Sequence, residues 1–170
     1  MKVVVNDANI LIDIVKLQIE SFFFELEFDF YTTDLVFEEL NANQATRLKS
    51  FIEANKLFVE PLEPVDLIEL YDLRNGVSGL SDNDLSAYLL SKNKDGVLIT
   101  SDLQLRKFAK GKKVSVHGHL WVFDQLVETG ILHPESACEK LNELINEINK
   151  KLGLPKTECE KRLKYWMGLY

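Results

Sequence analysis

Short apolar runs alternate with longer segments of helical periodicity along the chain, and this alternation limits the possible folds more than any other feature of the sequence. Residues 2–6 have the sequence KVVVN, a continuous β-branched run that is typical of a strand buried on both faces. Residues 8–17 follow at once with the apolar spacing of a helix. Alternation of this kind predicts an α/β fold in which helices cover both faces of a parallel sheet.

The same pattern continues to the end of the chain. Further strands are predicted at 28–32, 57–59, 97–100 and 114–116. Helices are predicted at 35–40, 44–55, 65–74, from 81 onward, and at 103–110, 120–129, 134–152 and 155–165. We therefore expect a three-layer α/β/α sandwich with a parallel sheet of four to five strands. The length of 170 residues favours a single domain, 1–170, with a helical C-terminal extension over about 134–170.

Composition excludes some classes of protein. The longest stretch without Asp, Glu, Lys or Arg covers only residues 114 to 123, whereas a membrane helix needs about 20 apolar residues. The first residues lack the long apolar core of a signal peptide, so we expect a cytoplasmic chain with no membrane partner. In a reducing compartment Cys138 and Cys159 are expected to be packed thiols.

The charge balance bears on nucleic-acid binding. The chain has 20 Lys and Arg against 27 Asp and Glu, a net charge of −7. Broad nucleic-acid binding usually depends on basic side chains that neutralise phosphates. If this protein acts on nucleic acid, another source of positive charge is needed.

Four acidic residues lie where a site could form. Asp7 and Asp102 each follow a predicted strand, and sites in open parallel sheets lie beyond the carboxyl ends of the strands. Asp84 lies in the first turn of its helix, and Glu39 lies in the helix after the second strand. Each residue alone also has an ordinary explanation, because acidic residues complement helix N-termini or stay solvated.

Together these residues indicate a metal site. Two carboxylates about 4 Å apart repel by about 4 kcal/mol at an effective dielectric constant near 20, so four in one crevice would need protons or cations. Oxygen-rich sites of this sort hold Mg²⁺ or Mn²⁺. Such an ion can bind a phosphodiester oxygen, lower the pKa of an attacking water and supply the positive charge that the chain lacks.

Four ordered segments carry a resemblance to a known family. They cover residues 3–12, 37–40, 80–84 and 98–102, and they lie within the first 110 residues. On these motifs the chain resembles the PIN-domain ribonucleases, which include the toxins of bacterial and archaeal toxin–antitoxin modules. The resemblance implies that Asp7, Glu39, Asp84 and Asp102 are catalytic. Asp7, Asp84 and Asp102 would be metal ligands, with Glu39 a ligand or a water-orienting base.

Two positions have a competing neighbour. Glu38 precedes Glu39, and we prefer Glu39 because its Glu-Leu pair matches the family. Asp82 lies two residues before Asp84, and this separation points the two side chains apart on a helix. We expect Asp84 to be the ligand and Asp82 to complement the helix dipole.

Supporting roles are predicted for polar and basic neighbours. Asn9 occupies a position that is often Ser, Thr or Asn in the family, where it would hydrogen-bond Asp7. Thr100 or Ser101 could orient a metal-bound water. Arg106 and Lys107 begin a group of cations beyond Asp102 and are our best candidates for binding a substrate phosphate, although a solvated helix end is the simpler explanation of this group.

His117-Gly118-His119 is the remaining candidate for metal binding. Alternate residues on an extended segment point in opposite directions, and no third soft ligand lies nearby. We therefore interpret Gly118 as a tight turn between a strand and a helix.

The function predicted from these observations is that of a Mg²⁺- or Mn²⁺-dependent endoribonuclease acting on RNA. The resemblance also implies a homodimer and a possible small antitoxin partner. A phosphatase or phosphotransfer domain is one alternative, but Asp7-Ala8-Asn9 lacks the second Asp of a haloacid-dehalogenase pattern. A PIN module that binds RNA or a protein without catalysis is the other.

Overall fold

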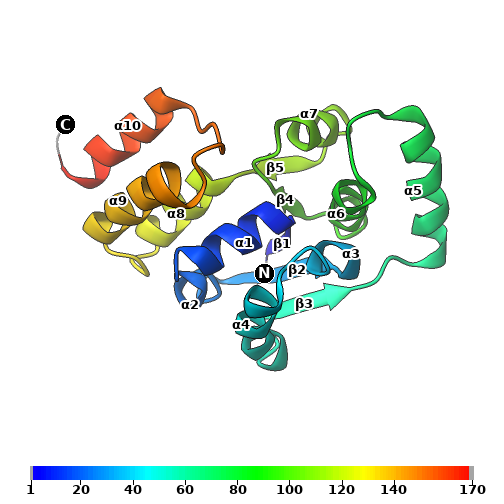
Figure 1. Cartoon of the computed structure of the whole chain (residues 1–170), viewed down its shortest axis with the longest axis horizontal. Helices are drawn as coiled ribbons and strands as arrows, with labels where there is room; N and C mark the ends of the chain where they lie inside the picture. Colours follow the sequence, from blue (N-terminus) through cyan, green and yellow to red (C-terminus); the bar gives the residue numbers. More distant parts are fainter. Residues whose placement is uncertain (1, 169–170) are drawn as a thin grey trace.

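A five-stranded parallel sheet forms the centre of the computed structural model, which describes residues 2–168. The strand order is β3-β2-β1-β4-β5, so β1 lies in the middle of the sheet (Figure 1). The strands are β1 (Lys2–Asn6), β2 (Phe28–Thr33), β3 (Leu57–Glu60), β4 (Val97–Ile99) and β5 (Ser115–His117). The predicted α/β class is confirmed, and so is the parallel sheet, which has five strands where four to five were predicted.

Helices cover both faces of this sheet. One face packs against α1 (Ala8–Lys16), α2 (Glu20–Phe23), α4 (Ala42–Glu53), α8 (His119–Glu128) and α9 (Pro134–Glu143). The other packs against α3 (Asp34–Phe37), α5 (Pro64–Gly76), α6 (Asp82–Asn93) and α7 (Leu103–Gly111). Neighbouring strand residues serve opposite cores, since Val97 and Ile99 join the first core and Leu98 joins the second. This two-sided burial explains why the strands are continuously apolar.

The C-terminal region contains the largest difference from the predicted elements. Residues 134–152 were predicted to form one helix, but α9 ends at Glu143 and continues as the π-helix η1 (Leu144–Ile148). Asn149 leaves helical geometry and donates a hydrogen bond to Asp13 of α1. This contact with a distant segment ends the helix, and the local apolar pattern carries no sign of it.

A last helix, α10 (Lys156–Trp166), packs against α9. Arg162 of α10 makes a bidentate ion pair with Asp124 of α8, with N–O distances of 2.7 to 3.0 Å. Figure 1 shows α10 and α5 at opposite ends of the long axis of the molecule. The predicted extent of 1–170 includes residues 1, 169 and 170, which lie outside the described residues.

Shorter elements also differ from expectation. The helix α2 was not predicted, because its four residues, ESFF, are too few to show a period. The predicted helix 35–40 is the short α3, which Thr33 caps by accepting a hydrogen bond from Val36 N. Gly118 lies between β5 and α8, as predicted for a strand-to-helix turn.

Two predictions from composition can be compared with the structure directly. Within residues 2–168, no helix combines the length and apolar character that crossing a bilayer requires. Cys138 and Cys159 are both buried free thiols, as expected, and burial raises the pKa of each.

Candidate functional site

Asp7 lies at the carboxyl end of the central strand, where it is the N-cap residue of α1. Its Oδ1 accepts a hydrogen bond from the backbone N of Ala8 at 2.8 Å. Its Oδ2 accepts two more, from Thr100 Oγ1 and from Asn9 Nδ2, each at 2.6 Å. Asp7 is only 4% exposed, so the fold holds a carboxylate in a fixed orientation beneath the surface.

The surroundings of Asp7 disfavour its ionised form. Burial is the main cause that raises the pKa of Asp7 from its usual 3.8 to about 6, and the negative charges of Asp84 and Glu39 raise it further. The hydrogen bonds from Thr100 and Ala8 act in the opposite direction. The structure therefore places three of the four predicted acidic residues within electrostatic reach of one another.

Asp84 reaches this region from the first turn of α6. Its Oδ2 accepts hydrogen bonds from Ser81 N at 2.7 Å and Ser81 Oγ at 2.8 Å, which completes a capping box at the start of α6. Asp82, its competitor, forms an exposed ion pair with Arg74 at 3.0 Å. Of the two, it is Asp84 whose charge acts on Asp7.

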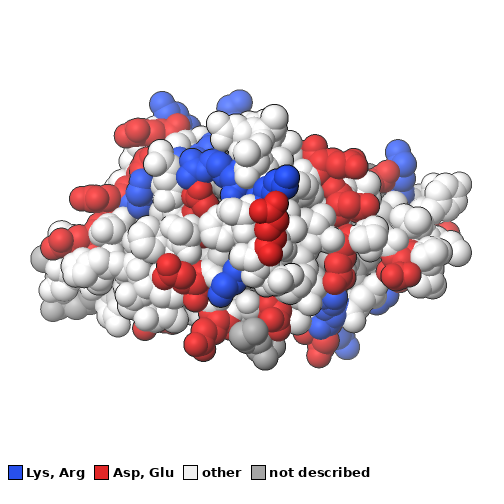
Figure 2. Space-filling model, turned by 90° about the horizontal axis from the view of Figure 1, so that it is seen from below, with Lys and Arg blue, Asp and Glu red and all other residues white. Residues whose placement is uncertain are grey.

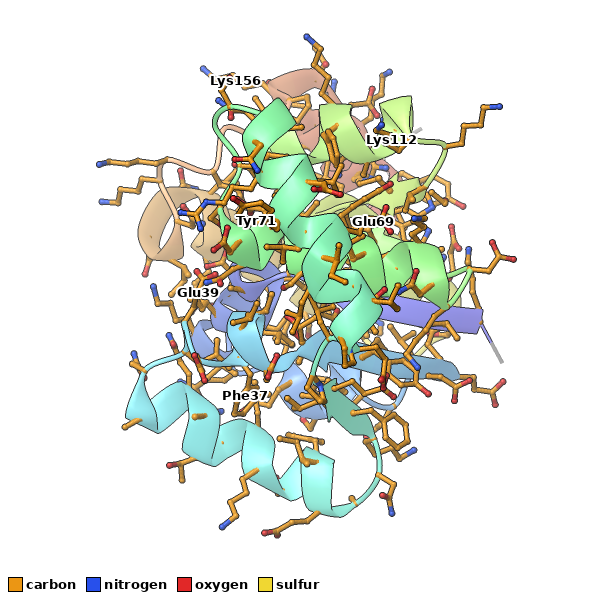
Figure 3. The ribbon with its side chains drawn as sticks, turned by 90° about the vertical axis from the view of Figure 1, so that its right-hand side faces the viewer. Phe37, Glu39, Glu69, Tyr71, Lys112 and Lys156 are labelled. Atoms are coloured by element: carbon orange, nitrogen blue, oxygen red, sulfur yellow. The ribbon has the colours of Figure 1, made fainter. Side chains whose placement is uncertain are left out.

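Glu39 is an exposed residue just beyond the end of α3, and Figure 3 shows it from the side of α5. Its Oε1 accepts a hydrogen bond from Asn83 Nδ2 at 2.6 Å, which connects it to the first turn of α6. The charge of Glu39 contributes to the raised pKa of Asp7.

Asp102 is the N-cap residue of α7 and lies at the end of β4, next to β1 in the sheet. Its Oδ1 accepts a hydrogen bond from Leu105 N at 2.7 Å, and its backbone N donates to Thr100 Oγ1 at 3.1 Å. Asp102 is exposed. Thr100 connects the two aspartates, but the carboxylate of Asp102 is bound to its own helix.

The donor set matches a hard divalent cation in its chemistry. The predicted ligands offer only carboxylate oxygens, and the buried Asp7 already lies in the field of two further negative charges. As the side chains stand, no three His, Cys, Asp or Glu residues among 2–168 are grouped closely enough to hold one ion. The carboxylate of Asp84 accepts from the N-cap residue Ser81, and that of Asp102 accepts from Leu105 N in the first turn of α7, so binding a shared ion would require both carboxylates to turn toward Asp7.

Asn9, Thr100 and Ser101 form a polar network around Asp7. Besides its bond to Asp7, Asn9 Nδ2 donates to Thr100 Oγ1 at 3.2 Å. Asn9 Oδ1 in turn accepts from Ser101 N at 3.3 Å. All three residues were predicted to support the site, and the structure places all three beside it.

Two more residues extend this network into the protein interior and were missed by the sequence analysis. Ser101 Oγ is hydrogen-bonded to His119 Nδ1 at 2.7 Å, and His119 Nε2 lies 3.0 Å from Asp13 Oδ2. The second contact is an ion-pair distance without hydrogen-bond alignment. His119 and Asp13 are almost fully buried, and Asn149 Nδ2 donates to the same Asp13 oxygen at 2.9 Å. No local spacing reveals a set spread over residues 13 to 149.

The structure separates the two basic residues predicted to bind substrate. Arg106 is half-buried, lines a cavity next to Ser101, and donates from Nη1 to Thr100 O at 2.7 Å. Lys107 is exposed and lines a different hollow, between α7 and the segment before α6. Of these two cations, Arg106 is therefore the one that contacts a residue of the acidic site, namely Thr100.

Comparison with known proteins identifies the family. A family model described as a PIN domain matches residues 3–165. The chain belongs to the PIN-domain family, as the sequence motifs indicated.

A solved structure of VapBC-1 from nontypeable Haemophilus influenzae includes a chain with a similar fold. Its TM-score is 0.50 at 15% sequence identity, and the match covers 68% of this chain and 97% of the other. A search of curated proteins found no match.

Proposed function

We propose that this PIN-domain protein is a Mg²⁺- or Mn²⁺-dependent endoribonuclease that hydrolyses phosphodiester bonds of RNA. The observation that carries the proposal is the buried Asp7 carboxylate, which lies at the carboxyl end of the central strand in the field of Asp84 and Glu39. PIN domains are generally nucleases, and family membership supports the same conclusion.

In this proposal Asp7, Asp84 and Asp102 hold the ion, and Glu39 is a further ligand or orients the attacking water. The ion, when bound, offsets the charge of the phosphodiester and makes the attacking water easier to deprotonate. Asn9 and Thr100 keep the Asp7 carboxylate in place through hydrogen bonds of 2.6 Å. Arg106 and Lys107 are proposed to bind phosphates of the RNA.

Contact with RNA must be local. On the face shown in Figure 2, Lys and Arg side chains are interspersed with Asp and Glu and do not form one broad basic region. This arrangement agrees with the net charge of −7. We therefore expect binding to depend on a few positioned cations and on the divalent ion rather than on a general positive field.

The proposal includes protein partners, namely a second copy of the chain and a small antitoxin. Its support is an exposed apolar surface on α5, where Val65, Ile68 and Tyr71 are 66 to 69% exposed. Figure 3 shows Tyr71 on α5, on the side facing the viewer. Apolar surface of this kind commonly marks a protein interface. Light scattering of the purified chain will give its oligomeric state, and a mass equal to one chain at micromolar concentration would count against the homodimer.

The direct test combines metal binding with cleavage. A thermal-shift titration with MgCl₂ and MnCl₂ should raise the melting temperature, because an ion that binds only the folded state stabilises it. The same ions should activate cleavage of a labelled structured RNA, and EDTA should stop it. RNA binding without cleavage at any metal concentration would favour the non-catalytic PIN module. Hydrolysis of small phosphate monoesters in place of RNA would favour a phosphatase.

A further inference from the structure

A cavity of about 300 Å³ lies directly beside the candidate active site. Ser101 and Leu103, the two neighbours of Asp102, are both in its wall. The opposite wall comes from the C-terminal extension, which contributes Leu154 and Pro155 from the turn before α10. The cavity therefore joins the PIN core to the extension.

Arg106 in this cavity has a guanidinium without an acidic partner. The chain has four arginines, and three of them pair with carboxylates: Arg47 with Glu20, Arg74 with Asp82, and Arg162 with Asp124. Among the ion pairs of residues 2–168 Arg106 has none. Burial lowers the pKa of Arg106, so its charge is partly desolvated, and only the carbonyl oxygen of Thr100, not a carboxylate, accepts from it among the contacts of residues 2–168. An anion in the cavity would supply a compensating negative charge.

Aromatic rings form another part of the cavity wall. His117 stacks on Trp121 with ring centroids 4.7 Å apart and an interplanar angle of 9°. Trp121 stacks in turn on Phe28, with centroids 5.5 Å apart. Stacked rings of this kind bind unpaired bases with little dependence on base identity.

The charge around His117 is positive although the whole chain is acidic. Burial is the main cause that lowers the pKa of His117, and Lys2, Arg106 and Lys110 lower it further. The ring is therefore neutral at pH 7, as a stacking surface should be, and three cations lie within electrostatic reach of it.

We propose that this cavity is a subsite for one unstacked nucleotide of the RNA substrate, with Arg106 on its phosphate and the His117–Trp121 pair against its base. The inference rests on the proposed nuclease function and extends it. The volume of the cavity, about 300 Å³, falls at the lower end of the range for small-ligand sites, which suits one nucleotide. The Arg162–Asp124 ion pair holds α10 against α8 and so keeps the cavity closed on the extension side.

The test measures binding apart from cleavage. Fluorescein-labelled hexaribonucleotides are titrated with the full chain in EDTA, and Kd is read from anisotropy. Arg106→Gln and His117→Ala should each weaken binding by about tenfold to a hundredfold, because a base stack or a charged phosphate contact is lost. Arg106→Lys should recover part of the loss. The matched control Lys49→Gln removes one exposed positive charge from α4 and should leave Kd unchanged. Melting curves verify that each variant is folded.

A second readout reports the stack itself. The chain has two tryptophans, and Trp166→Phe leaves Trp121 as the sole tryptophan. Addition of adenosine or uridine 5′-monophosphate should quench its fluorescence, and should do so more weakly after Arg106→Gln. Absence of quenching at millimolar nucleotide would overturn the assignment of the base position.

The outcomes separate the subsite from the nuclease. If the wild-type chain cleaves RNA with metal while both Arg106→Gln and His117→Ala bind like wild type, the subsite is wrong and the nuclease stands. If the two variants weaken binding but the wild-type chain cleaves no RNA with any divalent ion, the subsite stands and catalysis is refuted.

Discussion

The ends of β1 and β4 present the same local motif in two different environments. Each strand is followed by an aspartate that acts as the N-cap of the next helix: Asp7 comes directly after β1, and Asp102 comes three residues after β4. Asp7 is 4% exposed. It accepts hydrogen bonds from Thr100, just after the neighbouring strand β4, and from Asn9 of its own helix α1. Asp102 is exposed, and its carboxylate accepts a hydrogen bond from Leu105 N in the first turn of its own helix. The local sequence determines the motif in both cases. Burial is what destabilises the ionised carboxylate of Asp7.

This difference assigns the two aspartates different roles in stability. A buried carboxylate with a raised pKa destabilises the fold at neutral pH, and proteins retain such groups most often at functional sites. An exposed N-cap aspartate contributes to stability in the ordinary way. The predictions that follow test whether this division between the two strand ends is real.

The largest effect is expected on activity after Asp7→Asn. Cleavage should fall at least about 100-fold, because the loss of a metal-binding charge removes several kcal/mol of charge stabilisation. Single-turnover cleavage of a labelled RNA with saturating MnCl₂ measures the loss. Asp82→Asn is the matched control, since Asp82 pairs with Arg74 at the surface and should retain full activity. Equal activity of both variants would contradict the site.

The next effect concerns stability and its dependence on pH. The pKa of Asp7 is about 6 in the folded protein against 3.8, so its stabilising contribution is present below pH 4 and is lost as pH rises through 6. Relative to wild type, Asp7→Asn should gain up to roughly 3 kcal/mol in free energy of unfolding between pH 4 and pH 7. Urea unfolding at several pH values without metal measures this. A difference that does not vary with pH would show that Asp7 is not destabilised by burial.

A third effect should follow removal of the hydroxyl that bridges the two strand ends. Thr100→Val deletes the donor to Asp7 Oδ2 and the acceptor for Asp102 N, so activity should fall about 10- to 100-fold. The pKa of Asp7 should also rise, because the Thr100 hydrogen bond lowers it. Cleavage rates and the pH dependence of unfolding report the two effects. Thr100→Ser retains the hydroxyl and should restore both, while failure of that rescue would place the defect in packing.

The smallest effect is expected from Asp102→Asn on stability. Asparagine caps a helix about as well as aspartate does, so the free energy of unfolding at pH 7 should change by no more than about 0.5 kcal/mol. Urea unfolding beside Asp7→Asn gives the comparison. A gain in stability as large as that of Asp7→Asn would mean that both carboxylates are equally strained, and the division between the strand ends would be lost.

Much of this arrangement could be predicted from the sequence because it depends on neighbouring residues. The KVVVN run followed directly by Asp7 fixes a strand end, and the Ser81–Asp84 spacing fixes a helix start. The resemblance to the PIN family selected Glu39 over Glu38, and the contribution of Glu39 to the raised pKa of Asp7 agrees with that choice.

The remainder depends on contacts between distant segments. The π-helix at Leu144–Ile148 ends where Asn149 meets Asp13, 136 residues away in the chain. The contacts of His119 likewise join distant segments, since they connect α8 to Ser101 after β4 and to Asp13 of α1. The cavity at Arg106 requires the extension to fold back on the core. Helix and strand propensity and hydrophobic periodicity describe one segment at a time, so they do not predict contacts between segments that are distant in the sequence.

The position of β1 in the sheet has a consequence for the order in which the site is assembled. Asp7 is synthesised before its partner Thr100, which follows 93 residues later in the chain. The central strand cannot pair with β4 before that point. Until β4 and Thr100 have been added, the Asp7 carboxylate lacks the hydrogen bond that orients it, so the newly made polypeptide can organise this site only after that point.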